Sequence, residues 1–359
     1  MSNYIEYKDR VAFHPGYYIE EIVEESGLTQ QDFANRLDTT PKNLSKLING
    51  QQSLSVEMAM KLSRMLGTSL EYWLNIQNGY DIALAEKASD ARMKEEVVVL
   101  RELGYTYFRD NFQLPNLPRK LEEQVVQVRQ FLGLASLTVL RNPNLSTSLN
   151  GGNIKLEEEA LVKSNALVQI AMNEARKKDA PKFDRNKFEA SIDYALTQTT
   201  NRNGFYPLVE NAFLDAGVIL VTLPNLSGSK TNGVTKRMNS NIMLMVNSQH
   251  RYTSSFWFTL LHEAGRILNG DLGFSLENEA GKKESAANNF AKEKLVPKEA
   301  YEYFVLQGVF DLESIKSFSH KIDRDPGIVL KRLQDDKHVS RNDRSLSGLD
   351  YQYEFVSDF

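Results

Sequence analysis

Two adjacent residues near position 260 have the side chains that a hydrolytic zinc site uses. In such sites the sequence His-Glu-x-x-His lies on a helix, where two imidazoles bind the metal and the glutamate activates its water. His262 and Glu263 provide the first half of this pattern, but Arg266 occupies the position of the second histidine. A guanidinium has no lone pair to donate and keeps its charge. The spacing therefore predicts no metal and no catalytic residue, with His262 and Glu263 as remnants of a lost site.

A second group of polar residues has the spacing of a surface that contacts DNA bases. Between positions 41 and 49, Leu44, Leu47 and Ile48 recur at helical spacing and predict one buried face. The polar residues between them supply donors for base edges and phosphates, and two glutamines open the preceding helix. The predicted DNA-binding residues are Gln30, Gln31, Thr40, Lys42, Asn43, Ser45 and Lys46.

Local signals define the helices that would position these side chains. Thr29 is suited to cap a helix that ends near Leu37, and Pro41 suits the first position of the next helix. Asp38 lies in the short turn between them, where aspartate tolerates a left-handed backbone. These signals predict a helix-turn-helix. Periodicity alone would also fit a small helical bundle with no role in DNA binding.

Residues 13–80 resemble a known class of DNA-binding proteins. The run LTQQDFANRLDTTPKNLSKLINGQQSLSVEMAMKLSRMLGTSLEYWLNIQNGYD resembles the XRE family of helix-turn-helix regulators. FHPGYYIEEIVEESGLTQ before it and SLEYWLNIQNGYD at its end resemble HigA-type antitoxins, although Asp38 stands where the family more often has glycine. The resemblance implies a five-helix, lambda-repressor-like domain that binds double-stranded operator DNA as a homodimer. It also implies a cognate toxin as a further partner.

The second half of the chain resembles the ImmA/IrrE family of metallopeptidase-like domains. The segments that carry this resemblance are HEAGR, NIMLMVNSQHRYTSSFWFTLLHEAG and ANNFAKEKLVP, with VLRELGYTYFRD, FYPLVENAF and DPGIVLKRLQ as further matches across most of 90–335. Members act on partner regulators through zinc bound by two histidines and a later glutamate. In this alignment Ala286 takes the glutamate position, and Glu284 lies about 200° round a helix from it. The resemblance thus implies a degenerate domain that has lost two of three ligands.

Composition limits the class of protein. The chain has 359 residues, of which 41% are hydrophobic and 25% charged, as in ordinary globular proteins of two or three domains. There is no cysteine, no signal peptide and no run of about 20 apolar residues, so we expect a cytoplasmic protein without disulfides or membrane spans. The net charge is −4, which argues against bulk attraction to nucleic acid and favours a dimer on two half-sites.

The pattern along the chain predicts an α+β protein that is mainly helical with a small antiparallel sheet. Strands are expected at 217–223, 234–238 and 241–247, and helices at 255–268 and 284–297. SLNGG at 148–152 has the composition of a linker. The predicted domains are the helix-turn-helix domain (1–82), a helical connecting region (83–200), the peptidase-like domain (201–340) and a loosely ordered or docking tail (341–359).

Three functions are compatible with these features. The first is a sequence-specific transcriptional regulator, a HigA-like antitoxin that represses its own operon and uses an inactive peptidase-like domain for sensing or for gripping a partner. The second is a zinc-dependent peptidase that cleaves a repressor or partner protein. The third is an antitoxin that neutralises a toxin by direct contact, with DNA binding secondary. We expect the first, with no cofactor.

Overall fold

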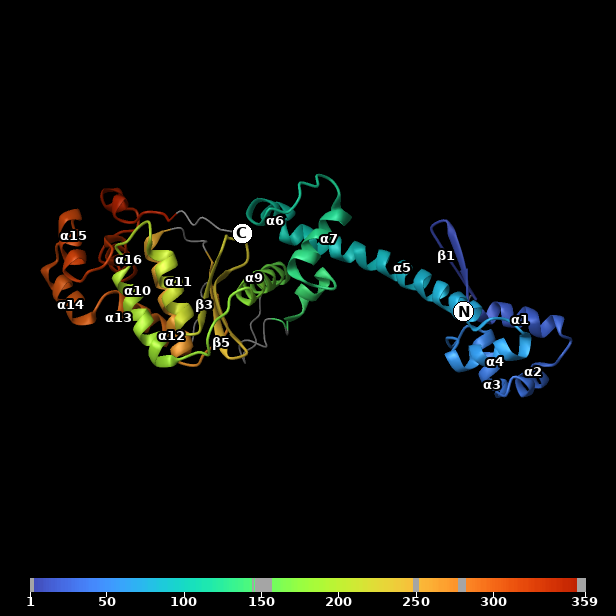
Figure 1. Cartoon of the computed structure of the whole chain (residues 1–359). Coiled ribbons are helices and arrows are strands. Elements are labelled where there is room, and N and C mark those ends of the chain that lie inside the picture. The colour runs from blue at the N-terminus through green and yellow to red at the C-terminus, as the bar shows by residue number, and fades with distance from the viewer. Residues whose placement is uncertain (1–2, 144, 146–156, 248–251, 277–281, 354–359) are drawn as a thin grey trace. The chain divides into compact units, whose positions relative to one another are not determined.

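The chain forms two compact units, Met1–Glu95 and Glu96–Phe359. The computed structural model describes residues 3–143, 145, 157–247, 252–276 and 282–353. One continuous helix, α5 (Leu70–Leu103), carries the chain from the first unit into the second (Figure 1). The predicted connecting region begins at 83 inside this helix. The predicted linker 148–152 and the last residues of the predicted tail, 354–359, lie outside the described residues.

The first unit is a helical bundle preceded by a β-hairpin. Tyr4–Tyr7 (β1) pairs antiparallel with Arg10–Phe13 (β2). The helices are α1 (Pro15–Glu25), α2 (Gln30–Arg36), α3 (Pro41–Ile48), α4 (Val56–Leu66) and the first part of α5. Their apolar faces enclose one core, in which Phe33, Leu44 and Trp73 are fully buried. The five predicted helices of this unit are therefore confirmed.

The predicted helix starts are confirmed by their capping hydrogen bonds. Thr29 accepts from the backbone N–H of Asp32, and Thr40 accepts from that of Asn43, so each side chain satisfies a donor that the helix leaves open. Pro41 is the first residue of α3, as expected. Asp38 has φ 52° and turns the chain from α2 to α3 in the left-handed region.

The second unit is built on a four-stranded sheet. Its strands are β3 (Val218–Leu223), β4 (Thr231–Met238), β5 (Asn241–Asn247) and β6 (Phe274–Leu276), in the order β3-β5-β4-β6. The antiparallel pairing is confirmed where β4 lies between β5 and β6. β3 runs parallel to β5. The last strand of the three, β5, lies between β3 and β4 and not at the edge of the sheet. The sheet is thus mixed within an α+β fold.

Helices cover both faces of this sheet. Along β3, Val218 and Leu220 join the main core of the unit, and the alternate residues Ile219 and Val221 are buried on the other face. Figure 1 shows α9 (Glu158–Arg176) on one side of the sheet and α11 (Phe205–Asp215) and α12 (Thr253–Leu268) on the other. Strands buried on both faces explain the nearly continuous apolar runs of β3 and β5.

The remaining helices complete the second unit. Before the sheet come α6 (Tyr105–Phe112), α7 (Leu121–Leu132), η1 (Leu137–Arg141) and α10 (Arg185–Thr197). After α12 come α13 (Lys282–Leu295), α14 (Lys298–Gln307), α15 (Leu312–Lys321), α16 (Pro326–Asp335) and η2 (Arg344–Leu349). Among the described residues, no helix is both long and apolar enough to cross a membrane.

The carboxy-terminal segment docks on α12 as far as the structure describes it. The Ser254 hydroxyl donates to an Asp350 carboxylate oxygen at 2.6 Å, and the indole of Trp257 donates to the Tyr353 hydroxyl at 2.8 Å. Tyr353 is 5% exposed, so its ring belongs to the core of the unit.

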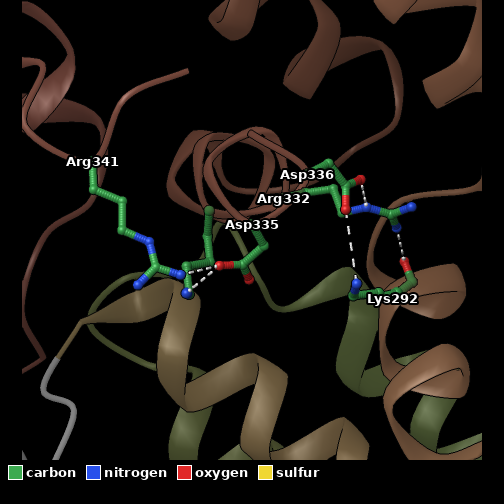
Figure 2. Close-up of polar contacts among 6 residues, drawn as sticks. Lys292, Arg332, Asp335, Asp336 and Arg341 are labelled. Carbon is green, nitrogen blue, oxygen red and sulfur yellow. Dashed lines mark hydrogen bonds and ion pairs between the residues drawn. The ribbon is translucent and has the colours of Figure 1, made fainter. Parts of the chain in front are cut away.

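The start of this segment is bound to α16. The Arg341 guanidinium donates to a carboxylate oxygen of Asp335 at 2.8 Å (Figure 2). The tail was predicted to be either loosely ordered or docked on the rest of the chain, and residues 341–353 are docked.

Candidate nucleic-acid interface and the His262 cluster

Helix α3 has one buried face and one polar face. Leu44, Leu47 and Ile48 are at most 1% exposed and hold α3 against the rest of the bundle. Lys42 and Lys46 lie one turn apart and are both exposed. The helix therefore presents two cations on the side that does not pack, which is the geometry of a helix that enters a groove of DNA.

Asn43 is fixed by two hydrogen bonds. Its side-chain amide donates to the Thr39 hydroxyl at 3.1 Å, and its side-chain oxygen accepts from the Gln52 amide at 2.9 Å. Gln52 also donates to the backbone carbonyl of Asn43 at 3.3 Å. Asn43 is thus oriented before any ligand arrives. Thr39 and Gln52 were not predicted, because Gln52 lies beyond the helix and no periodicity connects it to position 43.

The other predicted contact residues surround the start of α3. Thr40 caps the helix, and Ser45 is half-buried next to Asn49, whose amide donates to the Ser45 backbone carbonyl at 2.7 Å. Gln30 and Gln31 are exposed on the first turn of α2, and the Gln31 amide donates to Asn35 at 3.1 Å. The structure therefore places all seven predicted residues on or beside the two helices of one helix-turn-helix.

A close contact fixes α1 against α3. A Cβ atom added to Gly16 would lie 2.1 Å from the carbonyl oxygen of Leu47 and 2.7 Å from that of Ile48. Only glycine allows this approach. The imidazole of His14 caps α1 by accepting from the Gly16 N–H at 3.0 Å. The end of α3 is therefore held against α1 through its last carbonyl groups.

In the second unit, α13 supplies two partners for His262. One ring nitrogen, Nδ1, lies 3.1 Å from the side-chain oxygen of Asn288, and the other, Nε2, lies 3.3 Å from a carboxylate oxygen of Glu284. Ala286 is exposed. The predicted placement of Ala286 at the glutamate position is therefore wrong. Glu284 and Asn288, one turn apart, face His262 because α13 packs on α12 along this stripe.

The environment of His262 favours its charged form. Burial lowers the pKa of this imidazole, but the hydrogen bond that it donates to Glu284 and the charges of Glu263 and Glu284 raise the pKa. Arg266 lowers the pKa further by repulsion. The net shift is upward. His262 is therefore suited to donate to the carboxylate of Glu284.

Arg266 uses its guanidinium within the fold. Its Nε donates to the carbonyl of Asp271 at 3.1 Å, its Nη1 donates to the carbonyl of Phe274, and its Nη2 lies 3.8 Å from the Asp271 carboxylate. Glu263 is fully buried below β4, where an added Cβ on Gly233 would lie 2.4 Å from its carboxylate. Glycine at 233 makes room for that side chain.

These donors do not fit the three-ligand zinc site that the sequence motif of a metallopeptidase would require. Across the described parts of the chain, no three histidine, cysteine, aspartate or glutamate side chains gather in a way that could hold a metal ion. Arg266 stands where the second histidine would be, and its charge opposes a cation near His262. No chemical step through zinc follows from this arrangement.

The first unit has relatives among known proteins. A helix-turn-helix family matches residues 19–73. The HTH-type transcriptional regulator YddM of Escherichia coli K12 is 37% identical over 84 residues, which are 23% of this chain and 89% of YddM. Antitoxin HigA-1 of Vibrio cholerae is 37% identical over 62 residues, which are 17% of this chain and 58% of HigA-1. The structure of an addiction module antidote protein of a HigA family from Coxiella burnetii has 30% identity and a TM-score of 0.22, with 23% of this chain and 91% of that chain covered.

Proposed function

The chain belongs to the helix-turn-helix family of transcriptional regulators, and we propose that it binds its own operator and represses its operon as a HigA-like antitoxin. The observation that carries the proposal is the polar face of α3. Lys42 and Lys46 are exposed there, and Asn43 is held between Thr39 and Gln52. A capped helix with an anchored apolar side and a fixed amide on its polar side is suited to read base edges.

The contact residues divide into two roles. The ammonium groups of Lys42 and Lys46 bind phosphates or the acceptors of guanine, and the Asn43 amide reads adenine. Gln30 and Gln31, together with Thr40 and Ser45, contact the sugar-phosphate backbone of the DNA on either side of the recognition helix α3. We thus propose that all seven residues predicted from the sequence contact DNA.

The charge of residues 1–80 favours a dimer. Residues 1–80 contain seven lysines and arginines against ten aspartates and glutamates. Lys61 is moreover bound by Asp38 and Glu57, at 3.0 and 3.2 Å, so fewer cations remain for phosphates. One copy therefore makes few phosphate contacts, and specific binding in the cytoplasm requires two copies on two half-sites about 10 base pairs apart.

The second unit serves, in this proposal, as a peptidase-like domain that no longer hydrolyses and instead senses a ligand or grips a partner such as a toxin. Support comes from Arg266, whose guanidinium binds the carbonyls of Asp271 and Phe274 at the position of a metal ligand. The pairing of His262 with Glu284 supports the same assignment, because Glu284 raises the pKa of His262 and metal binding requires a neutral imidazole.

Footprinting on the DNA upstream of the chain's own gene tests the regulator. We expect the full chain to protect one inverted repeat, and Lys46→Glu combined with Asn43→Ala to lose that protection while the fold stays intact, as measured by circular dichroism. The neighbouring gene product should alter the footprint if it is the cognate toxin. Protection that persists in the double variant contradicts the assignment of α3.

A zinc peptidase is the second candidate, since His262 and Glu284 face each other at 3.3 Å and are two residue types that bind zinc. Metal analysis of protein purified without chelator separates the two candidates. We expect much less than one zinc per chain, because Arg266 opposes the cation. Stoichiometric zinc that disappears in His262→Ala would establish the peptidase site instead.

A further inference from the structure

Asn43 in α3 is held by a residue that lies outside both helices of the helix-turn-helix. Gln52 is half-buried in the segment between α3 and α4, nine residues after Asn43. Its side-chain nitrogen, Nε2, lies 2.9 Å from the side-chain oxygen of Asn43 and 3.3 Å from the backbone carbonyl oxygen of the same residue. Gln52 thus binds the side chain and the backbone of Asn43 at once.

The backbone carbonyl of Asn43 determines which way the two amides point. A carbonyl oxygen only accepts hydrogen bonds, so the end of the Gln52 amide that lies next to it must be the nitrogen. That nitrogen then requires an acceptor in the Asn43 side chain, which is Oδ1. The nitrogen of the Asn43 amide, Nδ2, is thereby turned toward the Thr39 hydroxyl, to which it donates at 3.1 Å. Gln52 therefore selects one orientation of the Asn43 amide.

Thr39 alone would not select that orientation. A hydroxyl both donates and accepts, so it could bind either the nitrogen or the oxygen of the Asn43 amide. The two orientations differ in what they offer to DNA. Adenine presents an acceptor, N7, beside a donor, the N6 amino group, in the major groove, and an asparagine amide matches them in one order only. A reversed amide would place its acceptor where its donor is needed.

Gln52 is itself held in place by the rest of the first unit. The imidazole of His14 is 2% exposed and forms a hydrogen bond with the backbone of Gln52. Two residues further along the chain, the Leu54 N–H donates to the side-chain oxygen of Gln77 at 2.7 Å. The segment that carries Gln52 is therefore anchored at two points, so Gln52 can impose a fixed orientation on Asn43.

We propose that Gln52 is a specificity-determining residue, which acts by positioning the Asn43 amide for one base. The inference rests on the proposed contact of α3 with DNA and adds a residue that determines the operator sequence. Gln52 contacts no base itself, so its effect passes through Asn43. Without Gln52 the amide would have to be ordered when DNA binds, and the ordering of one side chain weakens the affinity by about two- to tenfold.

Selection among randomised duplexes with the full chain, followed by titration of the selected operator, tests this role. Gln52→Ala should bind the operator about two- to tenfold more weakly than the parent, and random DNA equally well. In Gln52→Glu the carboxylate only accepts, so it should turn the Asn43 amide round and change the preferred base at one position of each half-site. With Asn43→Ala already present, Gln52→Ala should have no further effect, because the two residues act together.

Gln51→Glu is the matched control, because it adds the same charge to an exposed neighbour in the same segment. It should weaken binding to all duplexes alike and leave the preferred base unchanged. If a folded Gln52→Glu variant selects the same base as the parent, or if Gln52→Ala weakens binding to operator and random DNA alike, Gln52 does not position Asn43. A parent chain that selects no duplex would instead refute the proposed function, on which the inference rests.

Discussion

At the scale of single residues, Lys46 and Asn43 are neighbours on α3 with different physical roles. In the proposed function, the exposed ammonium of Lys46 binds phosphates of any sequence, whereas the Asn43 amide, which Thr39 and Gln52 hold, would discriminate among bases. Lys46→Ala should weaken binding to specific and random DNA alike and reduce the salt dependence by about one counterion. Asn43→Ala should reduce discrimination between operator and mismatched DNA by about 1–3 kcal/mol. Anisotropy titrations at several salt concentrations measure both effects.

Lys87→Ala is the control for this pair, because it removes an exposed lysine from α5 in the same unit. It should change neither the affinity nor the salt slope. If Lys87→Ala and Lys46→Ala behave alike, the effect of Lys46 is one of net charge and α3 does not contact the phosphates.

Asp325 predicts how the stability of the second unit depends on pH. It is 1% exposed, and burial raises its pKa from 3.8 to about 6, although the Gly327 N–H and Arg202 favour its charged form. The folded chain thus keeps a proton that the unfolded chain has lost between about pH 4 and pH 6. The contribution of Asp325 to the free energy of unfolding should therefore fall as pH rises through this window, by on the order of 2 kcal/mol.

Asp325→Asn tests this dependence, since asparagine keeps the cap on α16 without a charge. In urea unfolding the variant should be more stable than the parent at pH 7 and equal to it near pH 4. If the variant is less stable than the parent by the same amount at pH 7 and pH 4, the Asp325 side chain stabilises the fold through a hydrogen bond, and its buried charge does not destabilise it.

Residue roles were predictable where they depend on neighbours in the chain. Thr29, Thr40 and Asp38 act on groups at most three residues away, so sequence alone indicated their caps and their turn. The partners Gln52 of Asn43 and Glu284 of His262 depend on how separate segments pack. The error at Ala286 arose in this way, because the rotation of α13 against α12 is set by the core and not by spacing.

At the scale of elements, the packing of α1 on α3 depends on one glycine. Gly16→Ala would place a methyl group within 2.1 Å of a rigid carbonyl, so the two helices must separate. We expect the first unit to lose about 1–3 kcal/mol of stability. Gly79→Ala, on α5 where nothing lies within 4 Å, should instead stabilise it by about 0.5–1 kcal/mol through helix propensity.

Circular dichroism during urea unfolding measures the stability of the two glycine variants, and their affinity for the operator provides a second readout. Gly16→Ala should weaken DNA binding because it displaces the end of α3, and Gly79→Ala should not. Equal stability of the two variants would mean that α1 and α3 do not approach as closely as the contact at Leu47 requires.

Elements were predictable from the sequence to different degrees. The apolar runs of β3 and β5 and the periodicity of α12 indicated their type and approximate bounds. The direction of β3 could not be predicted. Its parallel partner β5 follows β4 in the chain, and β5 lies between β3 and β4 only in the folded sheet. The hairpin β1–β2 was not predicted either, since Lys8 takes a positive φ, 53°, without the Asn or Gly that signals such a turn.

At the scale of the whole molecule, different observations support the proposed roles of the two units. The family match ends at residue 73 and concerns the first unit. The proposed role of the second unit depends on its own residues, Arg266 and the pair of His262 and Glu284. Each unit can therefore be tested without the other, the first by DNA binding of variants in α3 and the second by the metal content of variants in α12.

Selection of bound fragments from the genome with the full chain tests the central claim most directly. The account predicts that fragments with one inverted repeat are enriched, that Lys46→Glu combined with Asn43→Ala removes the enrichment, and that Lys87→Ala retains it. If the folded chain enriches no sequence, or if the double variant enriches the same repeat as the parent, α3 is not the element that recognises DNA.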